Sequence, residues 1–197
     1  MRRIPAPGAW LPLFSLVIAL ALTPPGQAAA QNNSVPGFEL LNGNIRTGTD
    51  VIYLDGRFTG ELGSDAREAL DSGIPLTLQL QVRVIRPRRW LWDVDVVEFS
   101  QRQELRYHAL SRRYVVHNRA TGESRTFFRR DVAMAAWTTL ESVPLLRRRQ
   151  LESGQLYEVQ VRIRLDLDSL PHPLRTVAFV SPDWRLVSEW YTWPLEG

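Results

Sequence analysis

Alternation of apolar and polar residues is the dominant pattern along this chain. It is clearest after Pro75, where residues 76–84 place leucine and valine at every second position and threonine, glutamine and arginine between them. Residues 156–167 alternate in the same way. Because successive side chains of a strand point to opposite faces of its sheet, both segments are predicted to be strands with one face toward a core and the other toward water.

Shorter alternating segments, bounded by turn-forming residues, indicate further strands. They are residues 38–46, 51–59, 91–99, 101–110, 114–119, 124–128, 174–180 and 186–193. Strands that follow one another through short turns favour an antiparallel meander. The last two segments are predicted to form a closing hairpin around a turn at residues 181–183.

Two segments have helical spacing instead. Residues 64–73 begin with Ser64, whose hydroxyl is a predicted helix cap, and end at Gly73. In residues 129–143, apolar side chains recur three and four positions apart, and Pro144 is predicted to end the helix. The apolar stripe of this main helix is predicted to cover one face of the sheet.

These elements predict an α+β fold. We expect a mainly antiparallel β-sheet, folded into a sandwich or half-barrel, with one main helix packed on it. Residues 38–197 are predicted to form this single domain, since a segment of that length can bury a core. Residues 31–37 are polar and turn-forming, which predicts a flexible mature N-terminus.

Aromatic residues are concentrated near the C-terminus. Three of the chain's seven tryptophans lie within residues 181–195. Read as one strand, this segment places Leu186, Ser188 and Trp190 on one face and leaves Trp193 on the other. Because an indole ring buries a large area but keeps an N–H that needs a partner, the segment fits either a core or the rim of a binding groove, and core packing is the preferred interpretation.

The first thirty residues have the pattern of a secretory signal peptide. Arg2 and Arg3 give a positive start, residues 10–22 are mostly apolar, and small residues at 28–30 form a cleavage site. A periplasmic location is therefore predicted. The alternative is an uncleaved segment that anchors the protein to the inner membrane, although the apolar run is shorter than the roughly 20 residues of a spanning helix.

Composition narrows the chemistry. The chain has no cysteine, which excludes disulfides, thiolate nucleophiles, cysteine-ligated metals and a lipid-modified N-terminal cysteine. Loss of Arg2 and Arg3 with the signal peptide leaves 22 basic and 21 acidic residues, a net charge of +1. This near balance argues against nucleic-acid binding, which needs a basic excess on one face.

Two Asp-x-Asp pairs, Asp93/Asp95 and Asp166/Asp168, are the strongest candidates for metal or acid–base chemistry. On a strand, each pair would present two carboxylates about 7 Å apart on one face. A calcium site needs about six oxygens or more, however, and no acidic loop supplies them. A solvated strand face is the preferred interpretation, with Arg83, Arg162 and Arg164 as salt partners.

Other catalytic patterns are missing from the sequence. His108, His117 and His172 lack the paired spacing of a zinc motif, and the chain has neither a nucleophile elbow nor a glycine-rich phosphate loop. We therefore predict a protein that is not an enzyme and that uses no cofactor or metal. The alternative, a hydrolase, would require Asp93, Asp166 and a histidine to meet in one pocket.

Arginine clusters recur along the chain, at residues 88–89, 112–113, 129–130 and 147–149. Guanidinium groups recognise carboxylates and phosphates, so a shared patch would bind an acidic partner or anionic lipid headgroups. Scattered surface charges are the plainer interpretation. The candidate partner-binding residues are Arg88, Arg89, Trp90, Arg147, Arg148, Arg149, Trp190 and Trp193.

The chain resembles a family of bacterial exported proteins known as the domain of unknown function DUF4390. The resemblance covers residues 35–195 and rests on the order of elements, the strand at 156–168 followed by Pro171, and the ending from Trp184 to Trp193. The family has no established activity, cofactor or catalytic residue. The resemblance does imply a partner, because family members are often encoded beside a membrane sensor kinase of a nitrogen-regulation-like two-component system.

Two functional hypotheses follow. The first is a noncatalytic periplasmic interaction or accessory module whose partner is an unidentified envelope protein, with a membrane sensor kinase as one candidate and contact with lipid or a membrane surface as another. The alternative is a carrier or sensor of a small apolar ligand or lipid, bound between the sheet and the helix at 129–143. The walls of that site would be Trp137, Trp184, Trp190 and Trp193.

Overall fold

The structure is a computed structural model that describes residues 37–88 and 93–197. The predicted signal peptide, residues 31–36 of the predicted N-terminus and the candidate residues Arg89 and Trp90 lie outside the described residues. All of the described residues belong to the unit Ser34–Gly197.

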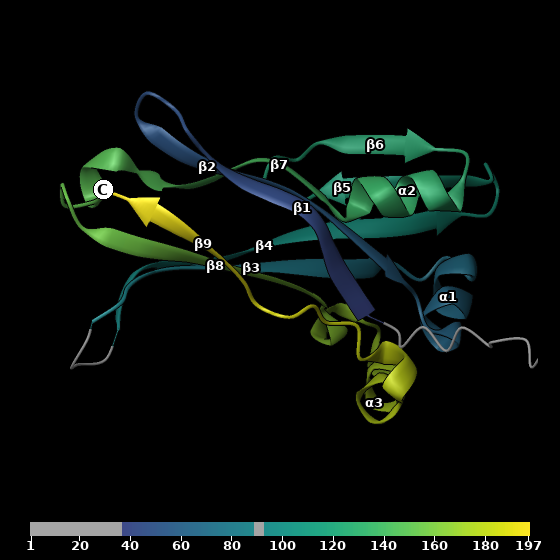
Figure 1. The fold of residues 1–197 in the computed structure, drawn as a ribbon. Coiled ribbons are helices and arrows are strands. Elements are labelled where there is room, and N and C mark those ends of the chain that lie inside the picture. The colour runs from purple at the N-terminus through teal and green to yellow at the C-terminus, as the bar shows by residue number, and fades with distance from the viewer. Residues whose placement is uncertain (1–36, 89–92) are drawn as a thin grey trace, which may run out of the picture. The chain divides into compact units, whose positions relative to one another are not determined.

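Strands make up most of the described chain (Figure 1). The strands are β1 (Gly37–Thr47), β2 (Val51–Glu61), β3 (Leu76–Arg86), β4 (Val94–His108), β5 (Arg113–Asn118), β6 (Ser124–Phe127), β7 (Thr139–Arg147), β8 (Leu156–Leu165) and β9 (Tyr191–Glu196). The helices are α1 (Ser64–Asp71), α2 (Arg130–Trp137) and α3 (His172–Val180), with the short 3₁₀ helices η1 (Arg148–Gln150), η2 (Leu167–Ser169) and η3 (Pro182–Trp184).

These strands form two antiparallel sheets. Sheet A has the order β1-β2-β7, and sheet B has the order β6-β5-β4-β3-β8-β9. The pairings between the named strands are antiparallel, and sheet B curls into a half-barrel. The predicted fold class is therefore confirmed. Helix α2 contacts β2, β4, β5 and β6, as Figure 1 also shows for β5 and β6.

The core lies between the inner faces of the two sheets, and the alternation read from the sequence sets those faces. On β8, the predicted inner residues from Tyr157 to Leu165 are buried, and on β3 the inner residues from Leu76 to Val84 are buried. Each such leucine or valine contributes roughly 1.5–3 kcal/mol relative to full exposure. The outer face of β3 departs from the prediction at its start, because Thr77 and Gln79 are buried as well.

Strand β4 is longer than the sequence indicated. The two strands predicted at 91–99 and 101–110 form one strand, Val94–His108. Ser100 is exposed and continues the outer face, and no glycine or proline interrupts the segment, so nothing in the backbone forces a turn there.

The prediction of a helix over residues 129–143 is wrong in its second half. Helix α2 ends at Trp137, and the chain then enters strand β7, which contains Pro144. Backbone pairing with β2 overrides the helical spacing: Phe58 donates its N–H to the Thr138 carbonyl at 3.0 Å, and the Thr138 hydroxyl donates to the Phe58 carbonyl at 2.7 Å. A proline is tolerated in β7 because this strand is an edge of sheet A.

The predicted C-terminal hairpin is also wrong. Residues 174–180 belong to helix α3, which begins with Pro171 as its N-cap and carries a further proline in its first turn. The last strand, β9, pairs instead with the free edge of β8. Because the strand begins only at Tyr191, the face predicted for Leu186, Ser188 and Trp190 is split: the first two are buried, and Trp190 is 38% exposed.

The predicted cap of the first helix differs as well. Gly63, not Ser64, is the N-cap of α1, and no side chain caps this helix end. The Ser64 hydroxyl donates instead to the Asp183 carboxylate in η3. A Cβ atom at Gly63 would lie 2.3 Å from the Asp183 carbonyl oxygen, so glycine is required for this close approach.

Candidate functional site

The outer face of sheet B carries a group of cationic, amide and aromatic side chains that we call the arginine face. It consists of Gln79 and Gln81 on β3, Arg162 and Arg164 on β8, and Trp190 before β9. The β3–β8 register sets Gln79 opposite Arg164 and Gln81 opposite Arg162. Long-range strand pairing therefore builds this group from three separate segments of the chain.

Both arginines are held by neutral amides. Arg162 donates from Nε and Nη2 to Gln81 Oε1 at 3.0 and 2.7 Å, and Arg164 donates from Nε to Gln79 Oε1 at 2.7 Å. The guanidinium carbon of Arg162 also lies 4.4 Å from the centroid of the Trp190 ring, within cation–π range. Among the ion pairs of the described residues, none involves Arg162 or Arg164.

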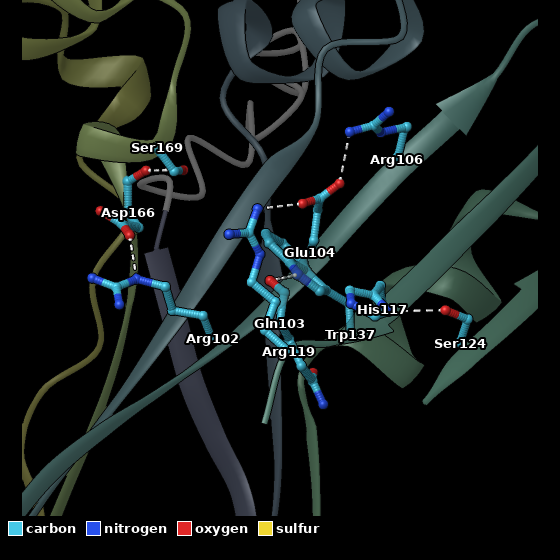
Figure 2. A network of polar contacts seen from close by, with 10 residues as sticks. All are labelled: Arg102, Gln103, Glu104, Arg106, His117, Arg119, Ser124, Trp137, Asp166 and Ser169. Carbon is cyan, nitrogen blue, oxygen red and sulfur yellow. Dashed lines mark hydrogen bonds and ion pairs between the residues drawn. The ribbon is translucent and has the colours of Figure 1, made fainter. Parts of the chain in front are cut away.

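A neighbouring polar network pairs three arginines of β4 and the segment after β5 with two carboxylates (Figure 2). Arg102 donates from Nε to the buried Asp166 carboxylate at 2.8 Å. Glu104 accepts from Arg106 at 2.9 Å and from Arg119 at 2.6 Å, and Figure 2 shows its carboxylate between the two guanidinium groups. These arginines thus have carboxylate partners, in contrast to the two of the arginine face.

The ion pairs of Glu104 lower the pKa of its carboxyl group. Burial acts to raise the pKa of Glu104, but the hydrogen bond from Arg119 and the charges and hydrogen bond of Arg106 outweigh it. The pKa of this carboxyl group therefore lies below its ordinary value, and the group is ionised at neutral pH.

A cleft lies on the other face of sheet B, between β7 and strands β3 to β5. Its volume is about 220 Å³, and it is partly open to solvent. Its apolar lining consists mainly of Leu78, Leu80, Val116, Leu140 and Val143. These side chains are buried, so the floor of the cleft is continuous with the core between the sheets.

Amide side chains form the polar part of this cleft. Gln101, Gln103 and Asn118 all line it. Leu78 pairs with Gln103, and Gln103 pairs with Asn118, so two amides stand in one row beside an apolar residue. The Gln103 Oε1 atom is buried and has no hydrogen-bond partner among the described residues. A buried polar atom without a partner is rare in folded proteins.

Charged residues line the rim of the cleft. Arg125 on β6 lies 3.3 Å from the Glu141 carboxylate on β7 and 3.9 Å from that of Glu123. The side chains of Arg125 and Glu141 are 37% and 64% exposed, so this ion pair crosses the cleft entrance in solvent.

The described members of the predicted partner-binding set do not form one surface. Arg88 follows β3, and Arg147, Arg148 and Arg149 are exposed around the end of β7. An ion pair of 2.7 Å between Arg86 and Glu152 brings these two segments to one end of the fold.

The two tryptophans of that set point to opposite sides of sheet B. Trp190 belongs to the arginine face, as described above. Trp193 is half-buried, packs against the core and donates from Nε1 to the Gly43 carbonyl at 3.2 Å. The opposite orientation of these two residues agrees with their predicted faces.

The tryptophan walls expected for a ligand site are not found. Trp137 and Trp184 are fully buried in the core, and none of Trp137, Trp184, Trp190 and Trp193 lines the cleft. One wall of the cleft is instead formed by residues 139–144, and the sequence assigned residues 139–143 to the second half of the main helix.

The aspartate pairs are also separated from one another in the structure. Asp95 pairs with Arg83 at 3.0 Å, as predicted. Asp166 follows the end of β8 and Asp168 lies in η2. The prediction that these two carboxylates share one face of a strand is therefore wrong. His117 contacts Ser124 at 2.9 Å (Figure 2). In the described part of the chain, no three histidine or acidic residues are grouped to hold a metal ion.

The sequence did not identify Gln79, Gln81 and Gln103 as site residues. For Gln103 a signal was present, because Gln101 and Gln103 occupy the inner, apolar positions of the alternation that runs from Phe99 to Leu105. No such signal was present for Gln79 and Gln81, because glutamine is common on the solvent-facing side of a strand.

Comparisons with known proteins give the family alone. No curated protein and no solved structure matches the chain. None of the described helices is long and apolar enough to cross a membrane. A family model described as "Domain of unknown function (DUF4390)" matches residues 36–194, which is most of the chain. The chain therefore belongs to the DUF4390 family.

Proposed function

We propose that this chain is a noncatalytic interaction module of the periplasm that binds a partner protein through the arginine face. The observation that carries the proposal is the pairing of Arg162 and Arg164 with neutral glutamines beside the exposed Trp190. The proposed role is that of an accessory to a membrane-bound sensor, and the family resemblance makes a membrane sensor kinase the first partner to test.

The charges of the arginine face favour an anionic partner. Side chains two positions apart on a strand are separated by about 7 Å, so the positive charges of Arg162 and Arg164 repel each other. Their glutamine partners orient the guanidinium groups without neutralising them. A carboxylate relieves this repulsion, and because the guanidinium groups are already oriented, little side-chain entropy is lost on binding.

Trp190 adds an aromatic contact to the same surface. Tryptophan and arginine are enriched among the residues that dominate the binding energy of protein interfaces. An extended partner segment with acidic residues at alternate positions presents carboxylates about 7 Å apart, which matches Arg162 and Arg164. A flat anionic membrane fits less well, because Asp95 and Glu98 are exposed on the outer side of the same sheet.

The proposal is tested by photo-crosslinking in cells. A photoreactive residue at Gln160, two positions before Arg162 on β8, is expected to capture one envelope protein. Replacing both Arg162→Gln and Arg164→Gln is expected to reduce this capture by about tenfold or more, since charge-assisted contacts would be lost.

A matched control uses the predicted cluster at the end of β7. The double substitution Arg148→Gln and Arg149→Gln removes the same charge elsewhere and is expected to leave the capture unchanged. Circular dichroism of both double variants checks that they fold. Equal capture by the Arg162/Arg164 variant and the unchanged chain contradicts the proposal, and so does the absence of any captured protein.

A carrier or sensor of a small ligand is the second candidate function. The cleft between β7 and sheet B favours it, because ligand sites are typically concave and mostly apolar with a few placed polar groups. This function uses the inner face of sheet B, so both functions are compatible in one chain.

A further inference from the structure

We propose that the cleft between β7 and sheet B binds a small, neutral, amphipathic molecule whose polar end is an amide or hydroxyl group. This inference rests on the second candidate function and specifies its ligand class. It is carried by the volume of the cleft, its apolar floor, its unpartnered amide and the charges at its rim.

The size of the cleft limits the ligand. A volume of about 220 Å³ corresponds to about seven water molecules at roughly 30 Å³ each, and it falls below the roughly 300 Å³ at which typical drug-sized pockets begin. A long lipid chain is therefore too large. The floor formed by Leu78, Leu80 and Val116 requires an apolar body on the ligand.

The unpartnered amide determines the polar end. Gln103 Oε1 is buried without a hydrogen-bond donor, and no hydrogen bond among the described residues holds its side-chain amide. Rotation of this amide presents Oε1 to a ligand N–H or O–H without breaking a bond. Asn118 uses its Oδ1 to accept from the backbone N–H groups of Ala120 and Thr121, at 2.9 and 3.2 Å. Its amide N–H groups remain as donors, so the complementary ligand group both donates and accepts.

The rim excludes an anion. Glu123 and Glu141 lie 3.9 and 3.3 Å from Arg125, so its single positive charge is more than balanced by two carboxylates. The other cation of the described lining, Arg102, is paired with Asp166. A carboxylate ligand would enter beside these negative charges and leave water for an apolar floor, which is unfavourable. A cation would have no charged partner inside, because the polar groups of the interior are neutral amides.

The entrance needs little energy to open. The Arg125–Glu141 ion pair is solvent-exposed, and exposed ion pairs contribute little to stability. Its two side chains come from β6 and β7, which are edge strands of different sheets, so they can part without breaking a strand pairing.

The test compares two probes that differ only in their polar end, hexanamide and hexanoate. Each is titrated at pH 7 into purified protein with isotope-labelled leucine and valine methyl groups. Hexanamide is expected to shift the signals of Leu80, Val116 and Leu140 saturably, with a dissociation constant of about 1–10 mM for so small a molecule. Hexanoate is expected to bind at least about tenfold more weakly.

A substitution separates ligand binding from folding. Gln103→Leu removes the unpartnered amide, so it is expected to leave the melting temperature unchanged or higher while weakening hexanamide binding by about tenfold. Gln160→Leu, on the outer face of β8, is the matched control and is expected to leave hexanamide binding unchanged.

The outcomes distinguish the ligand class from the carrier function. Equal binding of both probes in the cleft, or hexanamide binding that Gln103→Leu leaves unaltered, overturns the proposed ligand class and keeps the carrier function. Failure of both probes to shift the cleft signals overturns both. The partner-binding proposal is unaffected by either result, because it depends on the outer face.

Discussion

At one edge of the two-sheet structure β1 lies against β9, and at the other edge the cleft separates β7 from sheet B. On the first side, which we call the closed seam, Tyr191 accepts the Leu40 N–H at 3.0 Å and Trp193 donates to the Gly43 carbonyl. On the second side, the open seam, the Arg125–Glu141 ion pair joins the edge strands β6 and β7 in solvent.

Residue type explains this difference. Tyrosine and tryptophan are long, bury a large area and end in a polar group, so they pack between the sheets and also satisfy the backbone of β1. The cleft at the open seam has no aromatic residue among the described residues of its lining, which is aliphatic with three amides and a charged rim. The comparison teaches that the two sheet edges come together where long aromatic side chains join them and stay apart where shorter aliphatic and polar side chains face the gap.

The strongest test of the comparison removes an aromatic side chain from the closed seam. Trp193→Ala loses a half-buried indole and its hydrogen bond, so it is expected to lower the free energy of unfolding by about 2–3 kcal/mol. Urea unfolding followed by circular dichroism measures the loss. Trp190→Ala, three positions earlier but exposed, is the control and should cost less than about 1 kcal/mol; equal losses would contradict the closed-seam account.

The close approach at the closed seam gives the next effect. A Cβ atom at Gly43 would lie 2.7 Å from a ring carbon of Trp193, so Gly43→Ala is expected to cost about 1–2 kcal/mol in the same unfolding experiment. Gly56→Ala on β2 is the control, because the nearest atoms to its Cβ are 3.7 Å away. It should change stability by no more than about 0.5 kcal/mol, and a similar loss in both variants would show that the indole contact is not the cause.

Outside both seams, the ion pairs on the outer face of β4 and β5 are expected to matter at neutral pH. The folded-state pKa of Glu104 lies below its ordinary value of about 4.3, so its contribution is present above that value and is lost as the pH falls through the folded pKa. Glu104→Gln should therefore cost about 1–2 kcal/mol at pH 7, and this cost should shrink as the pH is lowered below about 4.3. Unfolding curves at several pH values between 7 and 3 measure this, and a cost that stays constant over the whole range would show that the carboxylate charge is not responsible.

The smallest effect is expected at the rim of the open seam. Arg125→Gln removes the ion pair with Glu141, but the Arg125 side chain is partly exposed and that of Glu141 mostly exposed, so the free energy of unfolding should change by less than about 0.5 kcal/mol. Thermal unfolding at low and at high salt is the measurement. A loss above about 1 kcal/mol, or a strong dependence on salt, would mean that this pair holds the two sheets together.

Much of the sheet architecture could be predicted from local pattern. The alternation in β3 and β8 identified their inner faces correctly, because side-chain direction in a strand depends only on the backbone repeat of two. The helix at 129–143 failed for the opposite reason: its second half satisfies its backbone by pairing with β2, about 80 positions earlier in the chain. Helical spacing carries no information about such a partner.

The candidate sites show the same division. Trp190 was a candidate from the sequence, and Arg162 was noted only as a salt partner of an aspartate. Its actual partner, Gln81, follows from the register between β3 and β8, which brings together residues 81 positions apart. One wall of the cleft is strand β7, most of which was predicted as a helix, so the position of the cleft could not be predicted from the sequence.

The sequence by itself determined which side chains of β3 and β8 point inward, that the fold is mainly antiparallel β, and which chemical groups are available. Only the tertiary structure decided which sheet edges meet, because Leu40 and Tyr191 or Gly43 and Trp193 are about 150 residues apart. Side-chain direction is a property of the local backbone. The closing of one seam and the opening of the other depend on which distant side chains face each other once the strands have paired.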